Sequence, residues 1–293
     1  MNLSAEMTQL ADWLPRAYTL SPMPPEEQQD QGPLRDNGTL EVTSHYLRDR
    51  NFLAVEAELE PLYVDYYLHL MEYQIRPDPA HDLLLKELLA ALTLHLTTRP
   101  REEATAWTVN LNDPALNLFA TGDSISGNIT GRIFTENVRS GRNDLFYSQV
   151  TRPGEETRQS MVKVEESTDA LKMVEHYYDQ SEQLPSRIFR LPDEKFLMIA
   201  GMPDCDEEWL AQLDQESAST LLKDEPADHM ETRSYQFGCG CTVAKILPAI
   251  EGLARSDMDG LFQGDPHLDI TCPRCGAAYI VSRSDLENWL KNR

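Results

Sequence analysis

Four of the five cysteines in this chain lie in two close pairs near its C-terminal end. Cys239 and Cys241 are separated by one residue in FGCGCT. Cys272 and Cys275 are separated by two residues in TCPRCGAAY, which follows 30 residues after the first pair. Four thiolates in two clusters form the ligand set of a closed tetrahedral zinc site. We therefore expect these four cysteines to bind one Zn²⁺ per chain.

The segment around these cysteines, residues 233–293, is expected to fold as a small zinc-binding domain. The pattern predicts a helix over 244–262, a hairpin formed by 267–271 and 278–282, and a capped helix over 284–292. A segment this short with little apolar content builds only a small core. Zinc binding contributes about 10–16 kcal/mol in small zinc peptides, so the metal is expected to decide whether this domain folds.

Other potential ligands and thiols are interpreted more simply. His229 and His267 could replace a cysteine in the metal site, but four cysteines suffice, so we interpret both as surface histidines. Cys205 is alone in an acidic segment and is interpreted as an ordinary cysteine; an additional redox-active thiol is the alternative.

A zinc–thiolate site is also sensitive to oxidation. Metal-bound sulfur stays deprotonated, and thiolate is the form that oxidants attack. Close cysteine pairs can form two local disulfides and release the metal, which would unfold the domain. A purely structural zinc ribbon fits the same spacing, and the residues alone leave both interpretations open.

The N-terminal sequence and the hydropathy favour a cytoplasmic protein. The first twenty residues lack a basic start and a continuous apolar run, so no secretory signal is expected. The most apolar window, 83–96, is interrupted by charged residues and is shorter than the roughly 20 residues of a membrane span. We expect no membrane partner, and in the reducing cytoplasm a permanent disulfide framework is the weaker explanation of the cysteines.

The net charge of −23 also limits the partners. Residues 231–293 contain seven Lys and Arg against eight Asp and Glu, so nearly all the negative charge lies in residues 1–230. A polyanionic surface repels phosphate backbones, and we expect no nucleic-acid partner.

The sequence divides into four segments. Residues 1–44 are expected to be a weakly ordered N-terminal extension, with one amphipathic helix near its start. Residues 45–203 are predicted to form an α+β substrate-binding core. Residues 204–232 contain ten acidic side chains against Lys223 alone, which predicts a marginal linker with transient helix. Residues 233–293 form the zinc domain.

Helices and short strands are grouped in the core segment. Helices are predicted over 59–73 and 78–96, the second with Asp78 as N-cap and Pro79 at its first position. Five strand-like runs between 105 and 165, a helix over 168–183, and strands at 186–191 and 195–201 complete an α+β layer structure. At helical spacing, four tyrosines are expected in the core, a client-binding face being the alternative: Tyr63, Tyr66, Tyr67 and Tyr73.

Two stretches and the cysteine pattern are similar to one known family. VEHYYDQSEQLPSRIFRL (174–191) with MIAGM (198–202), and AAYIVSRSDLENWL (277–290) after the cysteine pairs, resemble heat shock protein 33, a redox-regulated zinc-binding chaperone. The resemblance covers about residues 45–293.

This resemblance implies an ATP-independent holdase of the stress response, inactive when reduced and zinc-bound. Oxidation would release zinc, form the disulfides Cys239–Cys241 and Cys272–Cys275, destabilise the linker and expose apolar surface to unfolded client proteins, with possible homodimerisation. The linker is shorter than is usual in the family, and the extension and Cys205 are additional. A constitutive holdase, or a zinc ribbon that only recruits a protein partner, therefore stays open as an alternative.

Two enzymatic interpretations are less favoured. FATGDSISGN (119–128) resembles a serine hydrolase block with Ser124 as nucleophile, but the only Asp-x-x-His, Asp78 to His81, lies upstream of it. A thioredoxin-type enzyme would place a cysteine pair at a helix start inside a βαβ unit, whereas Cys272 and Cys275 lie in a predicted hairpin. We expect no catalytic residue and no enzymatic activity.

Overall fold

The computed structural model describes residues 39–138, 141–165 and 168–292. The amphipathic helix expected near the start of the N-terminal extension lies outside these residues. The described elements follow in this order: β1 (Leu40–Leu47), β2 (Phe52–Glu58), α2 (Glu60–Glu72), α3 (Pro79–Thr98), β3 (Ala104–Asn112), β4 (Ala115–Asp123), β5 (Asn128–Phe134), β6 (Leu145–Thr151), β7 (Arg158–Lys163), α4 (Ala170–Tyr177), the π-helical turn η1 (Tyr178–Glu182), β8 (Ser186–Arg190), β9 (Lys195–Gly201), α5 (Glu207–Gln212), α6 (Gln215–Asp224), β10 (Ala227–Phe237), α7 (Val243–Ser256), α8 (Met258–Phe262), β11 (His267–Thr271), β12 (Ala278–Ser282) and α9 (Arg283–Lys291).

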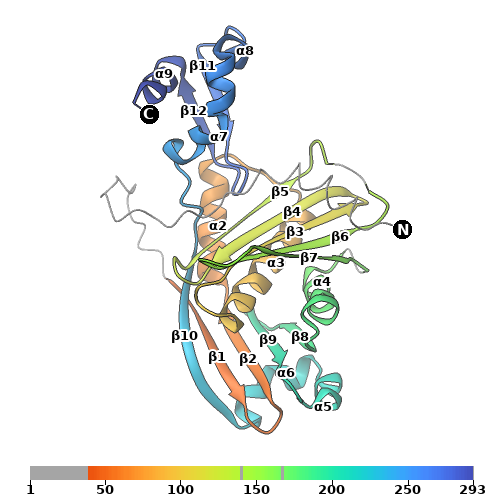
Figure 1. Ribbon diagram of the computed structural model, residues 1–293. Helices are drawn as coiled ribbons and strands as arrows, with labels where there is room; N and C mark the ends of the chain where they lie inside the picture. The colour runs from red at the N-terminus through yellow and green to blue at the C-terminus, as the bar shows by residue number, and fades with distance from the viewer. Residues whose placement is uncertain (1–38, 139–140, 166–167, 293) are drawn as a thin grey trace. The chain divides into compact units, whose positions relative to one another are not determined.

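Ten of these strands form one sheet in the order β7-β6-β3-β4-β5-β10-β1-β2-β9-β8. Neighbouring strands are antiparallel except at the junction of β5 and β10, where two residue pairs are parallel. The long strand β10 lies beside β1 (Figure 1). The hydroxyls of Thr43 and Thr232, which are 189 positions apart in the sequence, bond across these two strands. β11 and β12 form a separate antiparallel hairpin.

The helix α3 forms the centre of the core. Its N-cap Asp78 accepts a hydrogen bond from the Ala80 amide, and Pro79 occupies the first turn, as predicted. From Leu84 onward nearly every residue is buried, because this helix is apolar all round rather than on one stripe. Its side chains pack with those of β1, β4 and β5 in the largest apolar cluster of the described residues.

The expected α+β fold class is confirmed. The strands predicted between 105 and 165 correspond to β3 to β7, and the remaining predicted strands and helices of the core correspond to α2, α3, α4, β8 and β9. The hairpin of β1 and β2 was not predicted. It begins at Leu40, so residues 40–44 of the expected N-terminal extension belong to the sheet.

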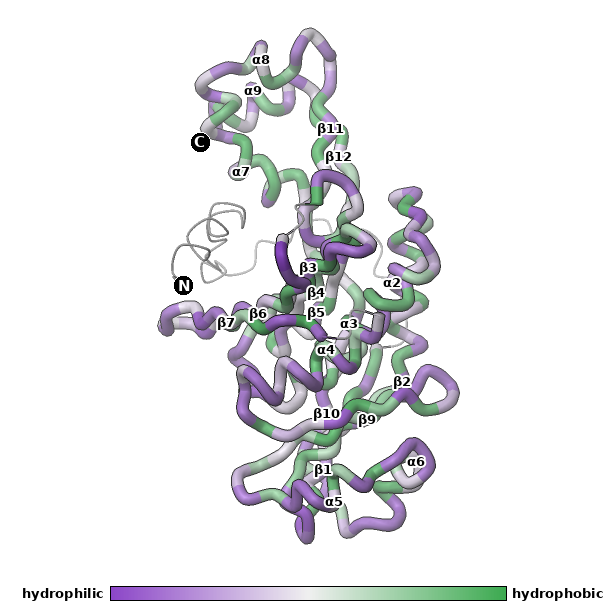
Figure 2. The backbone as a smooth tube through the Cα atoms, turned by 90° about the vertical axis from the view of Figure 1, so that its right-hand side faces the viewer, coloured by the Kyte–Doolittle hydropathy of each residue, from purple (hydrophilic) through white to green (hydrophobic). Residues whose placement is uncertain are grey.

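The acidic segment 204–232, expected to be a marginal linker, contains regular structure. It includes α5, α6 and the first part of β10, and the boundary proposed between 232 and 233 falls inside that strand. Asp214 and Ser217 form a capping box at the start of α6. In Figure 2 the chain around α5 and α6 is coloured mostly as hydrophilic, with short hydrophobic stretches.

Those short hydrophobic stretches cover one face of the sheet. Strands β2 and β9 are apolar on both faces, since alternate residues of a strand point to opposite sides. Val55 and Met198 pack in the main core, whereas Ala54 and Ile199 pack on the opposite face, in a second cluster. The members of this second cluster, called here the linker cluster, are Leu47, Phe52, Ala54, Phe189, Leu191, Leu197, Ile199, Leu210, Leu213, Ala218 and Leu221.

The linker segment is also attached by polar contacts. Arg50, in the turn between β1 and β2, donates to the Asp206 carboxylate at 2.9 Å and to Glu225 at 3.4 Å. Its guanidinium lies over the Trp209 ring, which in turn contacts Phe52. One arginine thus contacts both ends of the segment that contains α5 and α6.

Across the three described ranges, none of the helices combines the length and the hydropathy that a transmembrane span requires.

Candidate metal centre

The four paired cysteines come from two turns. Cys239 and Cys241 follow the end of β10 and precede α7, whose N-cap Thr242 accepts from the Lys245 amide. Gly240 between them has a φ of +59°, a backbone conformation that glycine adopts without steric cost. Cys272 and Cys275 lie in the turn that joins β11 to β12. The tertiary fold therefore brings together the two pairs that are distant in sequence.

The sulfur atoms are spaced as a tetrahedral metal site requires. All four lie within 4.8 Å of one another. Cys239 Sγ is 3.8 Å from Cys272 Sγ, and Cys241 Sγ is 3.5 Å from Cys275 Sγ. Four ligands at a Zn–S distance of about 2.3 Å in a tetrahedron are about 3.8 Å apart. The cluster therefore fits one metal ion of that size and preference, with no fifth protein ligand needed.

The turn of Cys272 and Cys275 is fixed by its own backbone. The Cys272 amide donates to the Ala277 carbonyl at 2.8 Å, and the Gly276 amide donates to the Cys272 carbonyl at 3.0 Å. Gly276 has a φ of +80°. These two bonds orient both sulfurs to the same side, as a zinc knuckle requires.

The two pairs differ in exposure. Cys272 and Cys275 are buried, each 2% exposed, whereas Cys239 and Cys241 are half-buried. Hydrogen bonding from Cys239 lowers the pKa of Cys241 to about 7 and also lowers the pKa of Cys272, whereas hydrogen bonding from Cys241 raises the pKa of Cys239 and hydrogen bonding from Cys239 raises that of Cys275. Within the group, thiolate is therefore favoured at Cys241 and Cys272, and thiolate is the form that binds metal.

Several core residues surround the cysteines, and sequence reasoning did not find them in this role. The His69 imidazole Nε2 lies 2.8 Å from the Cys275 carbonyl oxygen, and Arg132 Nη1 donates to the Cys272 carbonyl at 2.9 Å. Tyr73, at the end of α2, packs against the cysteines. The Tyr279 hydroxyl lies 3.1 Å from Cys241 Sγ. Nothing in the local sequence of these residues signals the contact, because most partners are more than 100 positions away.

Comparison with known proteins gives a consistent result. A family model described as Hsp33 protein matches residues 190–282, which include all four cysteines. A 33 kDa chaperonin of Aliivibrio fischeri is 26% identical over 270 residues, covering 80% of this chain and 91% of the relative. A 33 kDa chaperonin of Brevibacillus brevis is 26% identical over 145 residues, covering 40% of this chain and 50% of the relative.

The chain is thus similar in sequence to the Hsp33 family. The resemblance inferred from sequence is confirmed. Among solved structures, the fold is similar to the 33 kDa chaperonin (heat shock protein 33 homolog) of Thermotoga maritima, with a TM-score of 0.66, 12% identity, and coverage of 86% of this chain and 98% of that one. The described fold is thus an Hsp33 fold that contains a four-cysteine cluster.

The remaining candidate ligands lie elsewhere. His229 is on β10, with its Nε2 3.2 Å from the Thr232 hydroxyl, and His267 is exposed at the start of β11. Neither belongs to the group of four sulfurs. Cys205 precedes α5, where burial raises the pKa of its thiol, and it packs at the edge of the linker cluster.

Ser124 is not arranged as a nucleophile. Its hydroxyl lies 2.8 Å from the Tyr235 hydroxyl and 3.1 Å from Arg233 Nη1, in a buried polar network. Asp78 caps α3, and His81 lies in the first turn of that helix, so within the described residues the Asp-x-x-His motif has no hydrogen bond to Ser124. The Ser124 hydroxyl therefore serves as a hydrogen-bond partner of Tyr235 and Arg233.

The four tyrosines considered as core or client surface differ in burial. Tyr63 and Tyr66 are buried in the main core, and Tyr73 packs against the cysteines. Tyr67 is 41% exposed on α2, beside the exposed Val64 and Met71. These three residues are spaced by three and four positions and therefore lie on one face of the helix.

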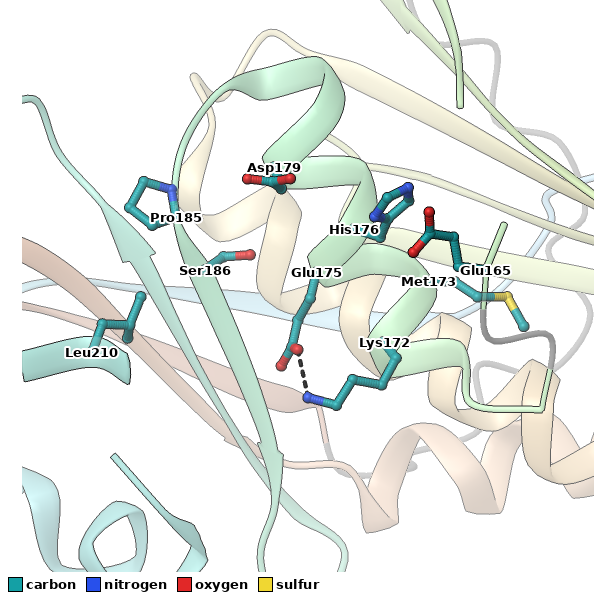
Figure 3. Close-up of a pocket in the computed structure, with 9 residues that line it drawn as sticks. All are labelled: Glu165, Lys172, Met173, Glu175, His176, Asp179, Pro185, Ser186 and Leu210. Atoms are coloured by element: carbon teal, nitrogen blue, oxygen red, sulfur yellow. Dashed lines mark hydrogen bonds and ion pairs between the residues drawn. The ribbon is translucent and has the colours of Figure 1, made fainter. Parts of the chain in front are cut away.

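A hollow of about 360 Å³ lies between α4, β8 and α5 (Figure 3). Within it Lys172 and Glu175 form an ion pair at 2.6 Å, and Leu210 of α5 borders one side. A second hollow of about 560 Å³ is lined by α4, β8 and residues 211–215. The linker segment therefore packs closely on the sheet but leaves space toward α4.

Proposed function

We propose that this Hsp33-family chaperone is an ATP-independent holdase whose activity is controlled by oxidation of its zinc–thiolate centre. Its clients would be unfolding proteins in the cytoplasm, and two oxidised chains would form a homodimer. It would need no catalytic residue beyond the redox-active cysteines. The observation that carries this proposal is the group of four sulfurs within 4.8 Å of one another, directly after the strand that follows α5 and α6.

Cys239, Cys241, Cys272 and Cys275 would bind one Zn²⁺ in the reduced protein. When bound, the metal supplies only a structural cross-link and keeps the sulfurs deprotonated. Oxidation by peroxide would convert two thiolates to one disulfide: the sulfurs lose two electrons, and the peroxide takes them with two protons to give two waters. The proposed pairs are Cys239–Cys241 and Cys272–Cys275, and disulfide sulfurs no longer bind zinc.

The linker segment would transmit this change. β10 connects α6 to Cys239, and its last residues, Gln236 and Phe237, pair with β5 next to the cysteines. Loss of the metal centre would remove the support at this end of β10, and α5 and α6 would then separate from the sheet. Two features favour such a release. The two hollows beside α5 leave part of the segment without packing contacts, and the many acidic side chains of the segment repel one another.

Release of α5 and α6 would expose the sheet side of the linker cluster. Phe52, Phe189 and Ile199 are among the apolar side chains that would become accessible. A contiguous apolar surface of this kind binds unfolded segments through the hydrophobic effect.

The test is light scattering by a heat-denaturing client enzyme. The protein would be added either reduced and zinc-loaded or after peroxide treatment at mildly elevated temperature, with released zinc measured by a chromogenic chelator. Suppression only after oxidation and zinc release is the expected result. A Cys205→Ser variant is the matched control, and it should behave as the wild type because it retains all four clustered cysteines.

A constitutive holdase with structural zinc is the second candidate. It is favoured by the exposed apolar face of α2 formed by Val64, Tyr67 and Met71, which needs no linker release. Equal suppression in both redox states would support this candidate. Suppression in neither state would favour a zinc ribbon that recruits a protein partner.

A further inference from the structure

Arg132 on β5 is in an unusual position for an arginine. It is half-buried, and its guanidinium lies over the Phe134 ring at 4.5 Å from the ring centre. Among the described residues, no carboxylate forms an ion pair with it. A partly desolvated cation without a carboxylate is costly unless another negative group compensates it.

The negative group near Arg132 is the cysteine cluster. Its Nη1 donates to the Cys272 carbonyl at 2.9 Å. Four thiolates on one Zn²⁺ have a net charge of about −2, so a fixed cation beside the two buried sulfurs stabilises the metal-bound state.

The turn of Cys272 and Cys275 is also in close contact with the core at this point. A Cβ on Gly276 would lie 3.0 Å from Ile75 Cδ1 and 3.6 Å from Arg132 Nε. His69 contacts the carbonyl of Cys275. The outer side of the knuckle therefore faces three side chains of the core, those of Ile75, Arg132 and His69, instead of water.

We propose that Arg132 is a positioning residue of the four-cysteine centre: it fixes the Cys272 carbonyl and supplies the counter-charge to the metal-bound thiolates. The core thereby contributes to metal affinity, although all metal ligands belong to residues 239–275. This inference rests on the metal site of the proposed function but not on holdase activity or on oxidation.

The experiment is competition for Zn²⁺ between a chromogenic chelator and the reduced full-length chain. Arg132→Met removes the charge and the donor while keeping a long side chain. It is expected to weaken zinc affinity by about 10-fold to 100-fold, the range found when outer partners of metal ligands are removed. Arg274→Met is the matched control, because Arg274 is exposed within the same knuckle, so that its charge acts on Cys239 through solvent and is screened; its effect should stay below about threefold.

Arg132→Lys separates charge from general packing. This variant keeps the positive charge and should bind zinc more tightly than Arg132→Met. Urea unfolding of the metal-free proteins provides a second readout: Arg132→Met should match the wild type without zinc and be less stable only with zinc, because the counter-charge acts on the metal-bound state. A purely structural role of Arg132 would lower the free energy of unfolding by the same amount with and without zinc.

The inference is overturned if Arg132→Met binds zinc within threefold of the wild type, if Arg274→Met loses as much affinity, or if Arg132→Lys equals Arg132→Met. It is also overturned if the metal-free variant is destabilised as much as the zinc-bound one. A wild-type chain that binds no zinc would refute both this inference and the proposed metal site. If the chain binds zinc but oxidation does not change its holdase activity, only the proposed function is refuted.

Discussion

Gly276 shows how one residue connects backbone conformation to metal binding. Its φ of +80° disfavours any residue with a Cβ, and the Ile75 side chain occupies the adjacent space. Gly276→Ala is expected to cost about 1–2 kcal/mol in the zinc-bound state, because the left-handed conformation is strained for alanine. Chelator competition should therefore show roughly 10-fold weaker zinc binding.

The control for this substitution is Gly252→Ala. Gly252 is in α7 with no atom near its missing Cβ, and alanine there should raise helix stability by up to about 1 kcal/mol without changing zinc affinity. Unchanged affinity in Gly276→Ala would mean that the turn adapts without strain.

His95 is a buried histidine that the proposed function does not use. Its Nδ1 lies 2.6 Å from the Tyr178 hydroxyl, and burial lowers its pKa well below 6.5, with Arg99 acting in the same direction. The unfolded chain therefore binds this proton first as pH falls, so His95 makes the free energy of unfolding decrease below about pH 6.5.

Replacement of His95 should flatten this pH dependence. In urea unfolding between pH 7.5 and 5.5, His95→Gln is expected to reduce the slope of the unfolding free energy by up to about 1.4 kcal/mol per pH unit, equivalent to one proton. Substitution of the exposed His267 should leave the slope unchanged. If His95→Gln keeps the wild-type slope, the acid sensitivity has another origin, such as His45, whose pKa burial also lowers.

Individual site residues differed in how well the sequence predicted them. The four cysteines were identifiable because cysteine is a characteristic zinc ligand and because these four occur in two closely spaced pairs. Arg132 and His69 were not, because an arginine in a strand and a histidine in a helix have ordinary explanations. Their role depends on long-range packing that no local pattern encodes.

At the scale of elements, α6 decides whether the linker segment stays on the sheet. Leu221 is 2% exposed and packs in the linker cluster. Leu221→Ala should destabilise this attachment by about 2–5 kcal/mol, the usual cost of a buried leucine cavity. The reduced, zinc-loaded variant is then expected to bind an apolar fluorescent dye and to lose hydrogen-exchange protection in α5 and α6.

Lys223→Ala is the matched change on the same helix, since Lys223 is exposed. It should leave dye binding and exchange at wild-type levels. Wild-type behaviour of Leu221→Ala would indicate that the linker segment is attached mainly through Arg50 and its two carboxylate partners.

The elements themselves were predictable where periodicity was clear. Strands β3, β4 and β6 have alternating apolar patterns, β9 is a continuous apolar run, and α2 and α4 have apolar residues at helical spacing, whereas α3 is apolar all round. The hairpin of β1 and β2 also carries a sequence signal, since apolar residues alternate in it at Leu40, Val42, Ala54 and other buried positions.

α6 and β10 were harder to foresee. In β10 only Arg233 and Tyr235 are buried, and the strand is formed by pairing with β1 and β5 rather than by its own composition. In α6 the buried positions Ala218 and Leu221 are few among charged residues, and tertiary contact outweighs the unfavourable charge.

At the scale of the whole molecule, we expect the C-terminal segment to depend on the metal for its folding. Its own apolar cluster contains only five buried residues, Leu247, Ala254, Phe262, Val281 and Leu286. Removing zinc from the reduced protein with a strong chelator is expected to abolish hydrogen-exchange protection over residues 239–290, whereas α3 stays protected. Mass spectrometry of exchanged peptides measures both regions at once.

Restoring zinc should restore protection, and a chain with all four clustered cysteines changed to serine should resemble the chelated protein. Persistent protection of α7 and α9 without zinc would show that the five-residue cluster is sufficient for folding.

The place of β10 in the sheet also has a consequence for synthesis. β1 and β5 are complete long before β10 leaves the ribosome, yet β10 is the strand that joins the two halves of the sheet. Until then the nascent chain has two unpaired strand edges, which attract other extended chains. The chain thus passes through a stage in which it is itself prone to aggregation, and that stage ends only when residues 227–237 are translated.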